Sequence, residues 1–325
     1  MAVSKSGKSR FLCLRAAPAT MQPMRSAALI IGMIALALPA RSWAGWPDRV
    51  GTRALGMGGA LRGAATGDAG PMLNPSGMSL ARAYAVEGSY QLTNGETAHR
   101  PHVSVVDSTS GFNIAGGLYY TYLTSKPNVS SQVSGHEAGA SLAVPFGQRL
   151  SVGGQLKYFR LVDEYVGEAD AMRPDQRTRG FTFDLGATVR PHDVLTLGVV
   201  GYNLADKSAP AAPLAVGFGA GLMPLPGLLL GADAVIDFTT YDDTRGNLTS
   251  YMGGAEYSTT NGLALRAGGG RNGQRASSYV SGGVSAVSEM AALDIGFSRD
   301  LSGTSKLTVF AISVRLFAAT AINPG

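Results

Sequence analysis

The chain has 325 residues, of which 45% are hydrophobic, 15% are charged and 44 are glycine. This composition is too apolar for a disordered chain, and its charged fraction lies well below the roughly 25% of a typical soluble domain. The formal net charge of +5 would suit a nucleic-acid-binding protein. However, six basic residues and no acidic residue precede Gly45, so the remainder is close to neutral and we expect no nucleic-acid partner.

Residues 1–44 have the pattern of an export signal. Arg25 supplies a positive charge, an apolar run follows at residues 27–38, and small residues surround a cleavage position at Ala44. The run is too short to span a bilayer as a helix. We expect export through the general secretory route with cleavage near Ala44. Three methionines are candidate start sites: Met1, Met21 and Met24.

The single cysteine of the chain, Cys13, lies within this expected signal. The exported protein would therefore have no disulfide framework and no metal site built on cysteine. We expect neither a bound metal nor a cofactor.

Residues 45–80 are rich in glycine and alanine and show neither a strand pattern nor a helical stripe. Glycines allow tight turns and close backbone approach, and Pro75 restricts Asn74 to an extended conformation. We expect a compact, irregular segment with these candidate gating residues: Gly56, Gly58, Gly59, Asn74, Pro75 and Gly77.

From residue 81 onward the hydrophobic pattern has a period of two. At residues 309–316, for example, large apolar side chains alternate with small or polar ones. Such alternation indicates strands with one apolar face and one polar face. We expect about 14 strands, beginning near residues 83, 101, 112, 137, 150, 181, 195, 214, 228, 248, 263, 278, 291 and 307.

Short turns alternate with longer polar loops, which we place at residues 93–99, 125–134, 163–179, 205–212, 239–246, 269–276 and 299–305. This alternation is typical of bacterial outer-membrane barrels. The prediction is an all-β fold: a transmembrane antiparallel up-and-down barrel at residues 81–318, with a short tail at 319–325.

Charged residues recur on the face of small residues. An arginine or lysine at the bilayer midplane costs about 2 to 4 kcal/mol on the lipid face, so we place these charges in the lumen. They either form a polar path for a ligand or pair across strands and brace the wall. The predicted lumen-facing set is Glu87, Lys157, Asp184, Asp233, Asp237, Glu256, Arg266, Asp294 and Arg315.

No catalytic constellation is evident. The four histidines occur in or beside connections, except His102, which lies near the start of a predicted strand. The segment around Ser79 lacks the second glycine of a nucleophile elbow. We therefore expect no enzymatic activity.

The segments GTRALGMGGA (51–60), ATGDA (65–69) and LNPSGM (73–78) resemble the start of the long-chain fatty-acid transporter (FadL-like) superfamily, which includes PorV- and PorQ-like barrels. The resemblance implies that residues 45–80 form a hatch inside a barrel of 14 strands. Relative to the family pattern, Ser76 replaces alanine and the loop at 163–179 is charged.

Two functions fit these patterns. One is passive uptake of small, hydrophobic molecules through an outer-membrane channel. The alternative is a barrel that transports nothing and acts as a structural adaptor in an envelope machine for secretion or surface motility. The expected partners are outer-membrane lipid and lipopolysaccharide, together with a hydrophobic ligand or an envelope protein complex.

Overall fold

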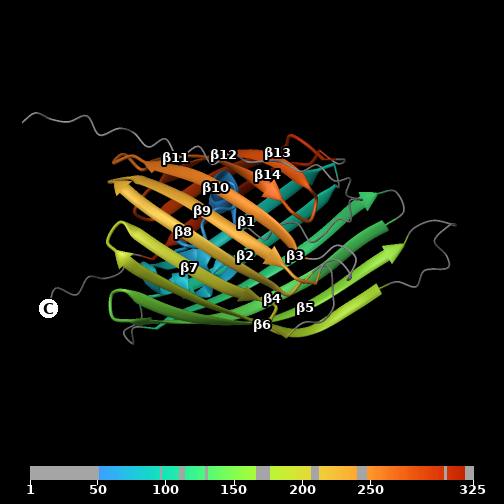
Figure 1. Cartoon of the computed structure of the whole chain (residues 1–325), viewed down its shortest axis with the longest axis horizontal. Coiled ribbons are helices and arrows are strands. Elements are labelled where there is room, and N and C mark those ends of the chain that lie inside the picture. The colour runs from blue at the N-terminus through green and yellow to red at the C-terminus, as the bar shows by residue number, and fades with distance from the viewer. Residues whose placement is uncertain are drawn as a thin grey trace, which may run out of the picture. The chain divides into compact units, whose positions relative to one another are not determined.

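A computed structural model describes residues 51–95, 97–109, 114–128, 131–165, 176–205, 212–239, 247–303 and 306–318. These residues form a closed antiparallel barrel of 14 strands, in which each strand pairs with its neighbours in sequence and β1 pairs with β14 (Figure 1). The strands are β1 (Tyr84–Asn94), β2 (Ala98–Asp107), β3 (Ala115–Asn128), β4 (Ser131–Phe146), β5 (Leu150–Tyr165), β6 (Gln176–His192), β7 (Leu195–Tyr202), β8 (Ala215–Leu225), β9 (Leu228–Asp237), β10 (Leu248–Ser258), β11 (Leu263–Asn272), β12 (Ser277–Val287), β13 (Ala291–Asp300) and β14 (Thr308–Phe317). The predicted fold class and strand number are confirmed.

The burial pattern shows why this sequence forms a barrel with an apolar outer surface. On β14, Phe310, Ile312 and Val314 are 46–49% exposed, whereas Ser313 and Arg315 between and beside them are buried. Successive side chains of a strand point to opposite faces, so the apolar set points outward and the polar set points into the barrel. This arrangement is inverted relative to a water-soluble protein and matches a barrel surrounded by lipid.

Two predicted loops are largely strand. Residues 93–99 contain only a three-residue connection between β1 and β2, and residues 125–134 contain a two-residue connection between β3 and β4. Serine, threonine and asparagine dominate these stretches and hide the strand pattern, but their backbone groups still pair across the ladder. The strands β3 to β6 have 14–17 residues each, whereas β7 to β14 have 8–11.

Three predicted features lie outside the described residues: the export signal at 1–44, the middle of the charged loop at 163–179, and the tail at 319–325. In the part of the chain that the structure covers, no helix is long and apolar enough to cross a membrane.

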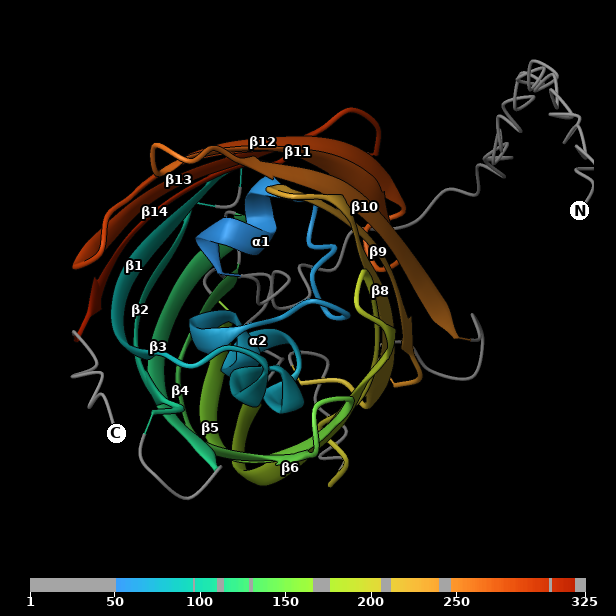
Figure 2. The same ribbon diagram turned by 90° about the vertical axis from the view of Figure 1, so that its left-hand side faces the viewer.

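The segment at residues 51–80 lies inside the barrel (Figure 2). It consists of four short helical turns: α1 (Thr52–Gly56), η1 (Gly67–Ala69), α2 (Gly70–Leu73) and η2 (Pro75–Leu80). We call these residues the hatch. No turn exceeds six residues, which is too short to produce a helical stripe in the sequence.

Glycines of the hatch and of the wall allow the two to touch through their backbones. Gly58 has a φ of +68°, and a Cβ atom there would lie 2.5 Å from the backbone nitrogen of Gly269 on β11. On β5, a Cβ at Gly153 would lie 2.4 Å from the backbone nitrogen of Ser76. Both distances are shorter than any normal contact, so only glycine fits at these positions.

The substitution Gly153→Val tests this backbone contact. Valine favours strands, so the barrel wall itself should tolerate it, but the added side chain would displace the hatch. We expect a loss of about 1–3 kcal/mol in the free energy of unfolding, the usual cost of overpacking. Urea titration of the detergent-solubilised barrel, followed by circular dichroism, measures it.

Gly88→Val is the matched control, because Gly88 on β1 faces outward and a Cβ there meets no atom within 4 Å. Equal stability of the two variants would contradict the proposed contact.

Candidate functional site

The hatch is joined to the barrel by ion pairs that use all of its charged residues. Residues 51–80 contain three charges, Arg53, Arg62 and Asp68. Arg53 forms a bidentate pair with Glu256 on β10, with distances of 2.8 and 2.7 Å. Arg62 Nη1 lies 3.2 Å from Asp233 Oδ2 on β9, and Asp68 Oδ1 accepts from Arg315 Nη1 on β14 at 3.2 Å.

Two of these pairs are ends of one continuous network. Arg266 on β11 donates to Glu256 at 2.5 Å and to Asp294 on β13 at 3.1 Å, and Arg315 donates to Asp294 at 2.8 Å. The charges therefore alternate in sign and run from hatch to wall and back: Arg53, Glu256, Arg266, Asp294, Arg315 and Asp68. We call these six residues the charge relay. Its formal charges sum to zero, which reduces the cost of burying them.

The two hatch members of the charge relay are ionised at neutral pH. Burial acts to raise the pKa of the Asp68 carboxyl, but Arg315, a hydrogen bond with Glu87, and Arg53 together hold that pKa below its usual value. Burial likewise acts to lower the pKa of Arg53, and Glu256 more than offsets it, so the pKa is raised. Both residues therefore remain charged, and the ion pairs persist.

The charge relay is the first anchor of the hatch, and a second anchor holds the middle of the hatch. Asp233 Oδ2 accepts from the backbone nitrogens of Leu61 at 3.0 Å and Arg62 at 2.8 Å, in addition to the Arg62 guanidinium. The Arg62 side chain also donates from Nε to the Tyr202 hydroxyl at 2.9 Å, and Tyr202 donates to the Leu73 carbonyl. One carboxylate thus fixes both the backbone and the side chain of the hatch.

A third anchor forms around Asn74, which is fully buried and has an extended backbone. Its Nδ2 donates to Arg62 O and to Thr188 Oγ1 on β6, each at 3.2 Å. Ser76 Oγ donates to Asn74 Oδ1 at 2.7 Å and lies 2.8 Å from Thr188 Oγ1. Pro75 begins η2 and is buried beside this cluster.

The four candidate gating glycines occupy other contacts with the wall or within the hatch. Tyr279 OH on β12 donates to Gly58 O at 2.7 Å, and Ser281 Oγ donates to Gly56 O at 3.2 Å. Gly59 has a φ of +82° and its carbonyl accepts from Arg62. A Cβ at Gly77 would lie 2.1 Å from Ala65 O within the hatch.

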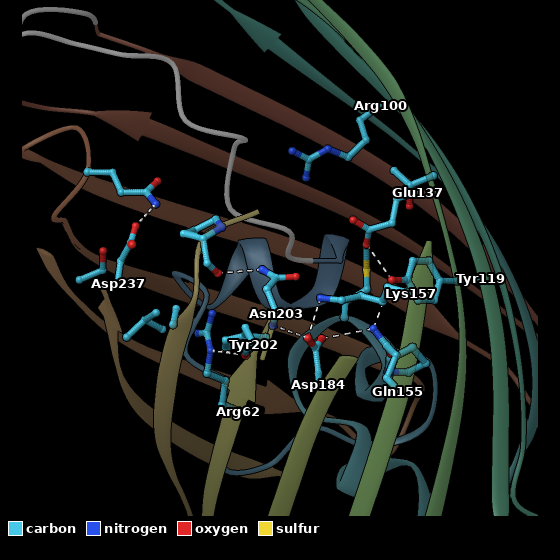
Figure 3. A pocket seen from close by; sticks show the side chains of 18 residues that line it. Arg62, Arg100, Tyr119, Glu137, Gln155, Lys157, Asp184, Tyr202, Asn203 and Asp237 are labelled. Carbon is cyan, nitrogen blue, oxygen red and sulfur yellow. Dashed lines mark hydrogen bonds and ion pairs between the residues drawn. The ribbon is translucent and has the colours of Figure 1, made fainter. Parts of the chain in front are cut away.

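A cavity of about 120 Å³ lies next to the hatch inside the barrel (Figure 3). Its hatch side is formed by Arg62, Pro71 and Met72. Six charged residues line it, three basic and three acidic: Arg62, Arg100, Lys157, Glu137, Asp184 and Asp237. The apolar part of the lining comes from Pro71, Met72, Pro213, Ala215 and Val235.

The polar side chains of the cavity are organised around Asp184 on β6. Its carboxylate pairs with Lys157 Nζ at 2.7 Å and accepts from the backbone nitrogen of Asn203 at 2.8 Å (Figure 3). Gln155 donates to Asp184 at 3.4 Å and to the Tyr119 hydroxyl at 3.2 Å. Tyr119 donates to Glu137 at 2.7 Å, so the network extends across β3, β4, β5 and β6.

All nine predicted lumen-facing charges are buried, and the structure divides them among four places. Glu256, Arg266, Asp294 and Arg315 belong to the charge relay, and Asp233 to the second anchor. Lys157, Asp184 and Asp237 line the cavity. Glu87 lies opposite Arg315 across the β1–β14 pair.

Sequence reasoning missed the hatch partners Arg53 and Arg62, and the cavity residues Tyr119 and Gln155. A signal existed for Tyr119 and Gln155, because both occupy the inward positions of alternating strands where the other residues are small. The ion pairs of the hatch have no local signal, since Arg53 and Glu256 are 203 residues apart. Among the described residues, no group of three or more histidine, cysteine, aspartate or glutamate side chains could hold a metal ion.

No protein-family model and no curated protein matches the sequence. Solved structures with the same fold include the toluene transporter TbuX of Ralstonia pickettii, at 14% identity, with a TM-score of 0.65 and coverage of 83% of this chain and 98% of that one. The monoaromatic hydrocarbon channel CymD matches at 15% identity and a TM-score of 0.63, covering 86% and 99% of the two chains. A FadL homologue of Pseudomonas aeruginosa matches at 15% identity and 0.62, covering 82% and 98%. The resemblance to FadL-like proteins is thereby confirmed as a shared fold.

The substitution Asp233→Ala tests the second anchor. It leaves a buried guanidinium and two hatch N–H groups without their carboxylate, and breaking a buried ion pair from one side costs about 3–5 kcal/mol. We expect a loss of that order in the free energy of unfolding, together with faster proteolysis within the hatch.

Asp193→Ala, at an exposed turn, removes the same charge and should change neither quantity. The pair Asp233→Leu with Arg62→Met removes both charges and should recover part of the loss. The anchor would be disproved if Asp233→Ala behaved like the turn variant.

Proposed function

We propose that the protein is an outer-membrane channel through which small hydrophobic molecules enter the cell by diffusion, with the hatch as its gate. The observation that carries this proposal is a hatch inside a barrel of 14 strands, a fold shared with a toluene transporter and a monoaromatic hydrocarbon channel. An export signal at 1–44, a hatch at 45–80, a barrel at 81–318 and a tail at 319–325 complete the proposed organisation.

The outward face supports the membrane location. Large apolar side chains remain exposed around the barrel, including Leu142 at 63%, Leu265 at 59% and Leu316 at 55%. In water such a surface would be a strong aggregation site, whereas in lipid it costs nothing. The three connections of ten residues or more follow β5, β7 and β9. These three strands end at the same end of the barrel, which we assign to the cell exterior by the usual rule for these proteins.

The cavity beside the hatch sets the scale of the permeant. A cavity of about 150 Å³ accommodates benzene, so 120 Å³ suits a molecule near the size of one aromatic ring rather than a long acyl chain. The lining combines apolar side chains with six charged ones, so a small aromatic molecule that also carries a hydroxyl group fits it as well.

The contacts of the hatch support a gating role. They are hydrogen bonds, ion pairs and van der Waals contacts, all of which can break and re-form without an energy source. The three anchors join the hatch to strands on opposite sides of the barrel, β6 on one side and β10 and β14 on the other. A permeant therefore passes when the third anchor, around Asn74, opens while the other two retain the segment.

No observation favours the adaptor function over the channel. The named structural neighbours are transporters and channels, and none is an adaptor or an enzyme. The charged loop at 163–179, which departs from the family pattern, lies largely outside the described residues.

A reversible disulfide between hatch and wall tests the gate. The only natural cysteine is Cys13, and the side-chain oxygens of Ser76 and Thr188 lie 2.8 Å apart. Ser76→Cys with Thr188→Cys therefore places two thiols close enough for a small shift to bring them to the S–S bond length of about 2.05 Å. When oxidised, the double variant should take up toluene no faster than cells without the protein. Uptake should return on addition of a reducing agent.

Each single cysteine variant is the control and should be insensitive to oxidation. Undiminished uptake through the fully oxidised double variant would show that the hatch does not gate the channel. A parallel series with phenol would show whether a hydroxyl group helps or hinders passage.

A further inference from the structure

The outer wall of β3 to β6 carries rows of side chains that follow from the strand register. One row joins Tyr120, Ala138, Tyr158 and Phe181, each directly opposite the next. The next row toward the loop end joins Tyr122, His136, Arg160 and Arg179 in the same way. We call the second row the basic row. Residues directly opposite in antiparallel strands share a face, so both rows point out of the barrel.

The basic row lies where the lipid-facing band ends. On β5 the outward positions from Leu150 to Tyr158 are apolar, aromatic or glycine, and Arg160 follows. Those nine residues are close to the 9–11 that a strand uses to cross the hydrocarbon core. Tyr158 and Phe181 pack at 5.1 Å between ring centroids, as aromatic girdles do at the membrane interface. Arg160 and Arg179 therefore lie at the level of the lipid head groups.

Arg160 and Arg179 lie directly opposite each other, and no carboxylate in the neighbouring outward rows balances their positive charges. Like charges directly opposite on neighbouring strands are destabilising. A third row, beyond the basic row, joins Thr124, Ser134, Val162 and Arg177, and none of the three rows contains a carboxylate. His136, beside Arg160, is exposed and accepts or donates a hydrogen bond with Tyr120 at 2.6 Å, while its ring lies 5.0 Å from that of Tyr122.

We propose that the basic row binds the phosphate groups of an anionic glycolipid in the outer leaflet. Two guanidinium groups offer paired N–H donors that match phosphate oxygens, and a phosphate between them relieves their repulsion. The acyl chains of the same lipid would lie along the apolar wall below. That wall contains a hollow of about 790 Å³ on β2 to β5, lined by Leu118, Leu142 and Leu156 around small residues. The basic row would thus contact the head group of the lipid, and the apolar hollow beside it would contact the acyl chains.

This inference rests on the proposed outer-membrane location but not on transport. The long strands β3 to β6 continue beyond the row of Tyr158 and Phe181, and they carry the basic row on this extension.

The test uses the purified full-length barrel in detergent, titrated with bisphosphorylated lipid A and analysed by native mass spectrometry. The double variant Arg160→Gln with Arg179→Gln should bind this lipid about 30-fold more weakly, since each arginine near an anionic lipid surface contributes about fivefold. Lipid A without its phosphates should bind the natural protein as weakly as bisphosphorylated lipid A binds the variant.

Arg82→Gln with Arg149→Gln is the matched control, because both are exposed arginines at the opposite end of the barrel. It should leave lipid binding unchanged. Three results would overturn the proposal. The first is that the Arg160/Arg179 variant binds lipid A as tightly as the natural protein does, and the second is that the control variant loses as much binding as the Arg160/Arg179 variant. The third is that the natural protein binds the dephosphorylated lipid as tightly as the bisphosphorylated one. Inorganic phosphate that competes fully at millimolar concentration would also overturn it, because the site would then recognise the free ion.

Uptake of toluene by the Arg160/Arg179 variant should match that of the natural protein. The two proposals can therefore be tested separately. Loss of lipid binding with unchanged uptake supports the lipid site. If the natural protein takes up no toluene, the channel proposal fails, but the lipid-binding result remains valid.

Discussion

The pairing of β1 with β14 is the constraint on which the remaining structure depends. Ten residue pairs, from Ala85 with Phe317 to Asn94 with Thr308, close the ladder and leave no strand edge. Unpaired backbone groups are too costly in hydrocarbon, so a sheet can lie in lipid only when it is closed. Closure then creates an interior, and the alternation that makes the outside apolar makes that interior polar. The hatch is the chain's own means of filling this space.

Filling a polar interior requires partners for its charges. The wall supplies both signs, and the three charges of the hatch each meet an opposite charge of the wall. A buried charge that loses its partner is far more costly than an exposed one, so the position of the hatch is specified by charge as well as by shape. Glycines at the contact let backbone approach backbone, which brings the carboxylate of Asp233 within reach of two hatch N–H groups.

The sequence predicted the strands well, because period-two alternation is a local signal that lipid makes strict. It failed at residues 93–99 and 125–134, where strands continue beyond the hydrocarbon core and outward residues no longer need to be apolar. The lumen positions of Asp184 and Arg315 followed from the same alternation. Their partners did not, because a pair such as Asp68 with Arg315 joins residues 247 apart and depends on the three-dimensional path of the hatch. The cavity was equally hidden, since it is the space left between two segments that the sequence describes separately.

The charge relay has a consequence for the order of assembly. Its two hatch members belong to the first part of the described chain, whereas its four wall members lie on β10, β11, β13 and β14. During synthesis Arg53 and Asp68 emerge long before Glu256 or Arg315, and contacts between such distant residues form late in folding. The relay is complete only when the last strand has paired with the first. Completion of the charge relay therefore reports that the last strand is in place, and a chain halted before that strand would leave Asp68 without its partner Arg315.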